Sequence, residues 1–175
     1  FSFQGEKIKM LFEELNINKD IVKGLREMGL KEPTKIQEKT IPLIKEGKDV
    51  IGTSKTGSGK TAAFGIPILE NVKPKHGIQA LIIVPVRELS VQITKELHKF
   101  GKYMEFKTTT VYGGVSINPQ IESMRNTDIV IGTPGRLRDH LENHKLDLSK
   151  IKTVVLDEAD KMVEMGFIED IRAIL

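Results

Sequence analysis

Short runs of apolar or β-branched residues alternate along this chain with segments in which apolar residues recur every three to four positions. The runs occupy Val50–Ile51, 79–84, 107–112, 128–131 and 152–156. Short runs bounded by turn residues are typical of strands buried on both faces of a sheet. We therefore predict strands at these positions, with Pro85 ending the second run because proline cannot donate a ladder hydrogen bond.

The intervening segments have the periodicity of amphipathic helices. In residues 87–100, for example, apolar residues three or four positions apart form one face. Asn18 and Thr34 are residue types that cap helix N-termini, and Gly29 is suited to end the first helix. Helices are accordingly predicted over about 18–28, from Thr34 to about Lys45, from Lys60 onward, over 87–100, and from residue 137 to about Asn143.

Strands that alternate with helices at this spacing indicate an α/β domain with helices on both faces of a mostly parallel sheet. In such sheets, ligands bind at the carboxyl ends of the strands. The glycine-rich, acidic and arginine-containing segments of this chain directly follow predicted strands. We therefore expect one binding edge to which several segments contribute.

Composition adds few limits. The chain has 175 residues, 39% hydrophobic and 29% charged, which is enough for one globular domain with a sizeable core. No apolar run reaches the ~18 residues of a membrane span and no signal peptide opens the chain, so we expect no membrane partner. Cysteine is absent, which excludes thiolate metal sites and disulfides and favours a cytoplasmic location. The net charge of +3 permits nucleic-acid binding without arguing for it.

The segment after Val50–Ile51 has the residue order of a phosphate-binding loop. Gly57 and Gly59 allow backbone N–H groups to turn inward toward an anion, and the following helix adds its positive end. Lys60 can reach β- and γ-phosphates, and the Thr61 hydroxyl is a ligand type for Mg²⁺. The loop reads Ser54-Lys55-Thr56-Gly57-Ser58-Gly59-Lys60-Thr61.

Ser54 departs from the usual loop pattern, which opens with glycine six residues before the lysine. The remainder of the pattern, Gly57 to Thr61, is intact, so we expect the phosphate cradle to form. A glycine-rich turn with a solvated lysine is the alternative interpretation. We favour a nucleoside triphosphate site.

An acidic pair follows the last predicted strand. Asp157 at the tip of residues 152–156 is placed to hold Mg²⁺ directly or through water, and Glu158 to orient or deprotonate an attacking water. A solvated acidic helix start is the alternative, because carboxylates favour helix N-termini. With the phosphate loop upstream, the pair favours a hydrolase.

Gln37 falls in the first turn of the helix that Thr34 begins. Its side chain offers an acceptor and two donors, which match the N6 amino group and N7 of adenine. Taken alone, a solvated surface glutamine is the simpler interpretation.

Together these motifs resemble the first RecA-like lobe of DEAD-box RNA helicases over almost the whole chain. Asp157-Glu158-Ala159-Asp160 is the family's name motif, and Gly29 to Gln37 is similar to its adenine-reading Q motif. Phe12 stands at the place of an upstream aromatic residue that packs on the base. Further matching segments are Pro85-Val86-Arg87-Glu88-Leu89, Gly113-Gly114 and Thr133-Pro134-Gly135-Arg136-Leu137.

The resemblance implies a three-layer RecA-like P-loop NTPase domain that binds ATP and Mg²⁺ and couples ATP hydrolysis to local strand separation in RNA. Lys60, Asp157 and Glu158 would be catalytic, and Thr61 and Asp157 would hold the metal. Residues that would bind ATP are Phe12, Lys31, Pro33, Gln37, Ser54, Thr56, Gly57, Ser58, Gly59, Lys60 and Thr61.

RNA would be contacted through phosphates and sugars without base readout, and told from DNA by its 2′-hydroxyls. The residues implied are Pro85, Arg87, Gly113, Gly114, Thr133, Gly135 and Arg136. Taken singly, Gly113-Gly114 could be only a turn and Arg136 only a solvated helix residue. Val86 replaces the family's threonine and removes a hydroxyl that could touch a phosphate, and Leu30 replaces a common phenylalanine.

The resemblance also predicts the domain organisation. We expect a lead-in with a short helix over residues 1–28 and the ATP-binding lobe over 29–175, ending before the family's Ser-Ala-Thr motif. The second RecA-like lobe, a partner in the family, carries arginines that stabilise charge on the transferred phosphate. Because the chain opens with Phe1 rather than Met, we expect an excised piece. Without the second lobe and the Ser-Ala-Thr motif, we expect it to bind nucleotide but not to unwind RNA.

Two other functions use the same motifs. One is an RNA-binding clamp that uses ATP as a latch without productive unwinding. The other is a DNA helicase or another P-loop motor, which the Gln37 element disfavours.

A structural metal site is not expected. His140 and His144 have the four-residue spacing of two zinc ligands on a helix. The zinc-protease pattern places glutamate directly after the first histidine, whereas Leu141 follows here and no third ligand is evident.

Overall fold

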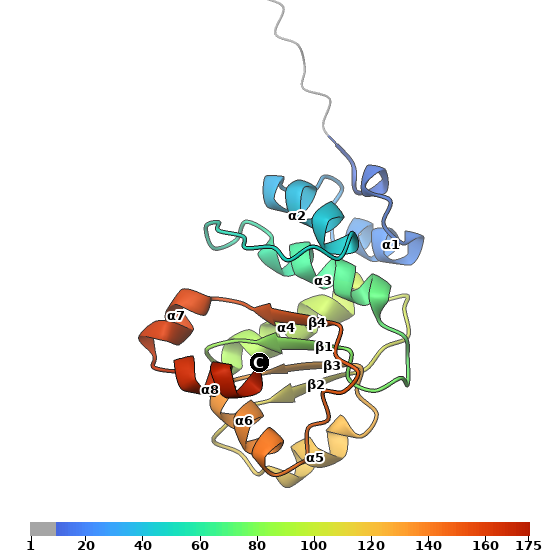
Figure 1. The fold of residues 1–175 in the computed structure, drawn as a ribbon. Helices are drawn as coiled ribbons and strands as arrows, with labels where there is room; N and C mark the ends of the chain where they lie inside the picture. Colours follow the sequence, from blue (N-terminus) through green and yellow to red (C-terminus); the bar gives the residue numbers. More distant parts are fainter. Residues whose placement is uncertain (1–9) are drawn as a thin grey trace, which may run out of the picture. The chain divides into compact units, whose positions relative to one another are not determined.

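The computed structural model describes residues 10–175, and the chain forms two compact units. Unit 1 comprises the described residues up to Glu70 together with Lys99–Tyr103, and unit 2 comprises Asn71–His98 and Met104–Leu175. Figure 1 labels the elements along the chain. Their bounds are η1 (Phe12–Leu15), α1 (Lys19–Glu27), α2 (Lys35–Lys45), α3 (Lys60–Asn71), β1 (Ala80–Ile83), α4 (Arg87–Phe100), β2 (Thr108–Val111), α5 (Asn118–Met124), β3 (Ile129–Gly132), α6 (Pro134–Glu142), β4 (Thr153–Leu156), α7 (Ala159–Glu164) and α8 (Ile168–Ile174).

Unit 1 is helical. The Asn18 side chain accepts a hydrogen bond from the backbone N–H of Asp20 at 2.8 Å and so caps α1, as the sequence predicts. The backbone N–H of Asn18 in turn donates to the Glu70 carboxylate at 2.8 Å, and Lys45 pairs with that carboxylate at 3.0 Å. One carboxylate therefore connects the start of α1, the end of α2 and the end of α3.

Gly24 explains how closely α1 approaches residues 99 and 100. A Cβ at this position would lie 2.5 Å from the carbonyl oxygen of Phe100. A side chain at this position would clash with the Phe100 carbonyl, and a backbone group cannot move aside as the end of a flexible side chain can. Glycine is therefore required here, for space rather than for a positive φ.

The strand predicted at Val50–Ile51 is wrong. The structure has no strand between α2 and α3, and the Ile51 side chain is 98% exposed. A strand needs a neighbour for its N–H and C=O groups. The described residues of unit 1 contain no strand that could supply one, so this segment runs as irregular chain into the glycine-rich loop.

Unit 2 is built on a four-stranded parallel sheet in the order β2-β3-β1-β4. Each strand matches its predicted run to within one residue at either end, and β3 extends one residue beyond its run, to Gly132. All residues of β1 and β3 are buried, as expected for strands covered on both faces. In the edge strand β4, Val154 and Leu156 remain partly exposed.

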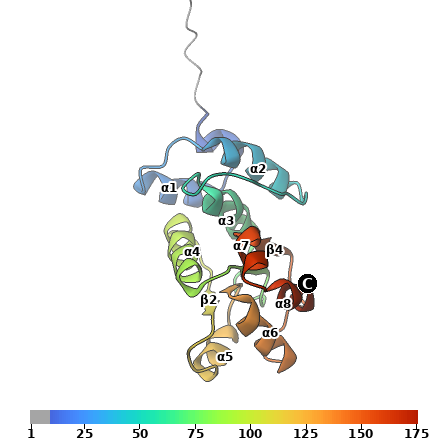
Figure 2. The ribbon, with the colours of Figure 1, turned by 90° about the vertical axis from the view of Figure 1, so that its left-hand side faces the viewer.

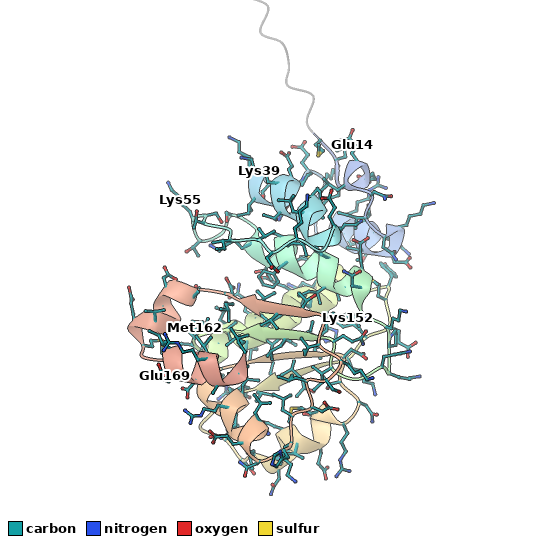
Figure 3. The ribbon with its side chains drawn as sticks, viewed as in Figure 1. Glu14, Lys39, Lys55, Lys152, Met162 and Glu169 are labelled. Carbon is teal, nitrogen blue, oxygen red and sulfur yellow. The ribbon has the colours of Figure 1, made fainter. Side chains whose placement is uncertain are left out.

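Helices cover both faces of this sheet. Alternate strand residues pack with Leu137 of α6, Met162 of α7 and Ile174 of α8 in one apolar cluster. Figure 2 shows α4 on the other side of the sheet from α6 and α8, and Figure 3 labels Met162, whose side chain is fully buried. The predicted α/β class with helices on both faces is confirmed.

Among residues 10–175, no helix is both long and apolar enough to cross a membrane. No group of three His, Asp or Glu side chains in the same range is arranged to hold a metal ion. His140 is instead a core residue with no exposed surface.

Candidate functional site

The glycine-rich loop of unit 1 closes around its own lysine. Lys60, the first residue of α3, donates from Nζ to the carbonyl oxygen of Ser54 at 2.7 Å. The Ser54 and Ser58 hydroxyls are 2.6 Å apart and hydrogen-bonded, and the Ser58 N–H donates to the Lys55 carbonyl at 3.2 Å. The ammonium group is thus held by the carbonyl oxygens of Ser54 and Lys55 within its own loop.

Two glycines allow this loop conformation. Gly57 has φ +78° and Gly59 has φ +89°, which side-chain-bearing residues rarely adopt. The Thr61 hydroxyl, one residue into α3, makes no hydrogen bond to the described residues. The sequence-based assignment of Thr61 as a metal ligand stays a prediction.

Gln37 is not a solvated surface residue. Its side chain is 4% exposed, and its Oε1 accepts the backbone N–H of Thr34 at 2.8 Å, completing the capping box of α2. Its Nε2 donates to the Gly59 carbonyl at 3.0 Å. A Cβ on Gly59 would lie 2.3 Å from this nitrogen, so glycine is needed there for space as well as for φ. The amide therefore joins the cap of α2 to the phosphate loop.

The other predicted adenine-site residues lie beside this cap. Phe12 is 2% exposed in η1, and its backbone N–H donates to the Lys31 carbonyl at 3.3 Å. Lys31 is exposed, and Pro33 is buried just before the Thr34 cap. The bond from Phe12 ties the aromatic residue to the segment that leads into Gln37.

In unit 2, hydrogen bonds continue the ladder beyond the carboxyl ends of the strands. The N–H of Val84 donates to Gly132 at 2.9 Å, that of Thr133 to Val111 at 2.9 Å, and that of Asp157 to Ile83 at 3.0 Å. The segments that begin at Pro85, Tyr112, Thr133 and Asp157 therefore start from one sheet edge, as predicted.

The acidic pair begins directly beyond β4. Glu158 has φ +53° and ψ +47°, a left-handed conformation that costs a residue with a side chain on the order of 1 kcal/mol. Its N–H donates to Oδ1 of Asp157 at 3.1 Å, and its carboxylate lies 3.4 Å from Lys161. The strained backbone turns the chain sharply into α7 and fixes consecutive carboxylates at the strand end.

The turn after β2 is held at both of its ends. Gln120 of α5 donates from Nε2 to the Tyr112 carbonyl at 3.0 Å, and Arg136 of α6 donates to the Val115 carbonyl at 3.0 Å. Between these points Gly113 and Gly114 are exposed, and Gly114 has φ +78°. The glycine pair is therefore a braced, exposed turn.

Arg136 is not a solvated helix residue. Its side chain is 13% exposed, and its Nη1 is buried without a hydrogen-bond partner among the described residues. Thr133 takes the N-cap position of α6, and Pro134 and Gly135 form its first turn, with Gly135 half-buried. Arg87 opens α4 and carries its guanidinium over the Tyr112 ring, 4.6 Å from the ring centroid.

The sequence analysis did not connect Tyr112, Gln120 and His140 with the glycine turn. His140 donates from Nε2 to Oε1 of Gln120 at 3.3 Å, and Gln120 holds Tyr112. Burial, and after it the charge of Arg136, lowers the pKa of His140. The signal in the sequence was a tyrosine directly before Gly113-Gly114, but only the fold shows what it contacts.

The chain is similar to known proteins of one family. Residues 34–175 match the DEAD/DEAH box helicase family. The ATP-dependent RNA helicase CshA of Limosilactobacillus reuteri is 51% identical over 168 residues, which are 95% of this chain and 34% of that protein. The DEAD-box ATP-dependent RNA helicase CshA of Bacillus subtilis is 48% identical over 166 residues, 94% of this chain and 34% of that protein.

A solved structure shows the same fold. A DEAD box protein from the hyperthermophile Methanococcus jannaschii matches with a TM-score of 0.92 and 43% identity, covering 94% of this chain and 46% of that one. The chain thus spans about a third of the length of the curated relatives it matches. The family match extends over most of the sequence, and the fold is that of a solved member. The chain therefore belongs to the DEAD/DEAH box helicase family.

Proposed function

We propose that this chain is the ATP-binding lobe of an ATP-dependent RNA helicase, in which ATP hydrolysis drives local unwinding or remodelling of RNA. The observation that carries the proposal is the Gln37 amide, which bonds both to the cap of α2 and to the Gly59 carbonyl of the phosphate loop. An adenine-reading group and a phosphate-binding loop are thereby connected through one side chain. The names of the relatives, ATP-dependent RNA helicases, support the same activity.

ATP binding would exchange hydrogen bonds already present in unit 1. Lys60 would leave the Ser54 carbonyl for phosphate oxygens, and the loop from Ser54 through Thr56 to Ser58 would open around the triphosphate. The adenine would be bound by Gln37, with Phe12, Lys31 and Pro33 shaping the segment around it. The contact between the Lys60 ammonium and phosphate oxygens would be charge-assisted, and such hydrogen bonds are among the strongest in proteins.

Lys60→Ala should weaken ATP affinity by 10-fold or more, about 1.4 kcal/mol, because the triphosphate charge then lacks its cation. Titration calorimetry of the chain with ATP and Mg²⁺ measures this. Lys55→Ala is the matched control, since Lys55 projects from the same loop, as Figure 3 shows, and is exposed. Equal affinity of wild type and Lys60→Ala would exclude the loop as the phosphate site.

Gln37→Ala should narrow the preference for ATP over GTP, because a site that hydrogen-bonds one base rejects another by leaving polar groups unpaired. Competition between the two nucleotides measures the preference. Gln37→Glu is a second test: its carboxylate can still accept the Thr34 N–H and keep the cap, but it cannot donate to the Gly59 carbonyl or to adenine N7, so this variant should narrow the preference as well. Wild-type protein that binds ATP and GTP equally would remove Gln37 from base recognition.

For hydrolysis, we propose that Thr61 and Asp157 are metal ligands and that Glu158 orients and deprotonates the attacking water. The free Thr61 hydroxyl and the consecutive carboxylates beyond β4 are oxygen donors of the type that Mg²⁺ prefers. The bound ion would neutralise charge on the phosphates. Lys60 would stabilise negative charge on the transferred phosphate.

RNA would bind along the carboxyl edge of the unit 2 sheet. The exposed Gly113-Gly114 turn offers backbone N–H groups, Arg87 offers a guanidinium, and Thr133 and Gly135 stand at the start of α6. Pro85 would contact the sugar-phosphate chain, and Arg136 would act through the Val115 carbonyl that it holds. These are sequence-independent contacts, and 2′-hydroxyl contacts would select RNA over DNA.

We further propose a second RecA-like lobe as partner, a lead-in over residues 1–28 ahead of the lobe, and a cytoplasmic location. The part of the Q motif lead-in before residue 10 lies outside the described residues. An ATP-dependent clamp and a DNA helicase remain the competing functions. In a two-lobed relative, ATPase stimulation by RNA but not by DNA excludes the DNA motor, and a strand-displacement assay separates unwinding from clamping.

A further inference from the structure

Arg87 and Tyr112 meet although their strands are not neighbours. Arg87 follows β1 and Tyr112 follows β2, and β3 lies between these strands in the sheet. The guanidinium carbon is nevertheless 4.6 Å from the centroid of the Tyr112 ring. The described residues provide this guanidinium with no hydrogen bond or ion pair. Its position therefore depends on the aromatic ring, and its N–H donors stay available.

Tyr112 is itself held from the core. Its carbonyl accepts Nε2 of Gln120 at 3.0 Å, and Oε1 of Gln120 accepts Nε2–H of His140 at 3.3 Å. Gln120 is 7% exposed and His140 is fully buried. The backbone of Tyr112 is thus held by α5, and through Gln120 by α6, directly before the exposed glycine turn.

We infer that Tyr112 is a positioning residue for Arg87: the Tyr112 ring pre-organises the Arg87 guanidinium to bind a phosphate of single-stranded RNA. The inference rests on the proposed function. A ring face attracts a guanidinium laid over it but leaves the N–H donors at the guanidinium edge free. Arginine that is already ordered loses less conformational entropy on binding, so the phosphate contact is stronger.

The test compares four variants of the full chain: Tyr112→Leu, Tyr112→Phe, Arg87→Ala and the double variant Tyr112→Leu with Arg87→Ala. Affinity for a single-stranded oligouridine is measured by NMR titration at several salt concentrations, since this detects weak binding. Tyr112→Leu should weaken binding by about two- to tenfold, the range for ordering one long side chain. Tyr112→Phe keeps the ring and should bind within about twofold of wild type.

Two readouts separate positioning from a general structural effect. Tyr112→Leu should leave the slope of log affinity against log salt unchanged because the arginine keeps its charge, whereas Arg87→Ala should lower the slope by about 0.7, the value for one phosphate contact to a single strand. In the absence of RNA, the ring-current displacement of the Arg87 Nε–H resonance should persist in Tyr112→Phe and vanish in Tyr112→Leu.

The inference is overturned if Tyr112→Leu binds RNA as well as wild type, or if it weakens binding equally in the Arg87→Ala background. An unchanged Arg87 resonance in Tyr112→Leu also overturns it, and so does a Tyr112→Phe variant as weak as Tyr112→Leu. A different result would contradict the proposed RNA surface instead. In that case Arg87→Ala leaves the RNA affinity and the salt slope unchanged, while the Arg87 resonance of the wild-type protein still shows the ring-current displacement.

Discussion

Residues 1–175, assayed by themselves, are expected to hydrolyse ATP in the presence of RNA about 10³–10⁵ times more slowly than a two-lobed relative. By the resemblance, the arginines that stabilise charge on the transferred phosphate lie in the second lobe. One such arginine raises the hydrolysis rate by about that factor. Part of the RNA groove would be missing as well. We therefore expect weak nucleotide binding, very weak RNA binding and no unwinding from this chain alone.

The measurement is steady-state ATP turnover with and without single-stranded RNA. A matched control joins residues 1–175 to the remaining chain of the Bacillus subtilis relative, which is 48% identical in the shared region. RNA stimulation that returns in the chimera assigns the deficit to the second lobe rather than to residues of this chain. RNA-stimulated rates of residues 1–175 comparable to those of the relative would show that one lobe is a complete catalyst.

Glu158→Gln, made in that chimera, is expected to lower ATP turnover by about 10²–10⁴-fold, the usual contribution of a general base. The amide keeps the size of the side chain and can still hold a water, but it is a far poorer proton acceptor. Because glutamine has the same shape, it should keep the left-handed backbone at this position, and binding of ATP and RNA should persist.

Glu164→Gln is the matched control, since Glu164 is an exposed carboxylate at the end of the same helix, α7. Loss of the contact between Glu158 and Lys161 should matter little, because exposed ion pairs contribute about 0–1 kcal/mol. Single-turnover kinetics distinguish slow chemistry from slow product release. A Glu158→Gln variant with wild-type kcat would remove Glu158 from the mechanism.

Much of unit 2 could be predicted from local patterns. Runs such as 79–84 and 128–131 are buried on both faces, and that requirement excludes polar residues from them whatever their neighbours are. Helix α4 occupies residues 87–100, as its periodicity predicts. The segments of unit 2 that begin at Pro85, Tyr112, Thr133 and Asp157 could be placed on one edge for a similar reason, because the carboxyl ends of parallel strands share it.

The local sequence pattern did not predict which segments pair with one another. Val50–Ile51 has the composition of a strand, yet no strand forms there and Ile51 is exposed. A strand exists only when a second segment accepts its hydrogen bonds, and that depends on distant parts of the chain. Gln37 is similar: its sequence position suggested a base contact, while its bonds to Thr34 and Gly59 depend on how the loop folds back.

The sequence by itself determined the class of the fold, because periodicity and glycine placement act over a few neighbouring residues, and its motifs carried the resemblance to the family. Only the tertiary structure decided which motif side chains support one another. The sheet order places β3 between β1 and β2, and the turns beyond these strands still bring Arg87 onto Tyr112. Such partners are set by strand order and side-chain reach across the sheet edge, which no local stretch of sequence encodes.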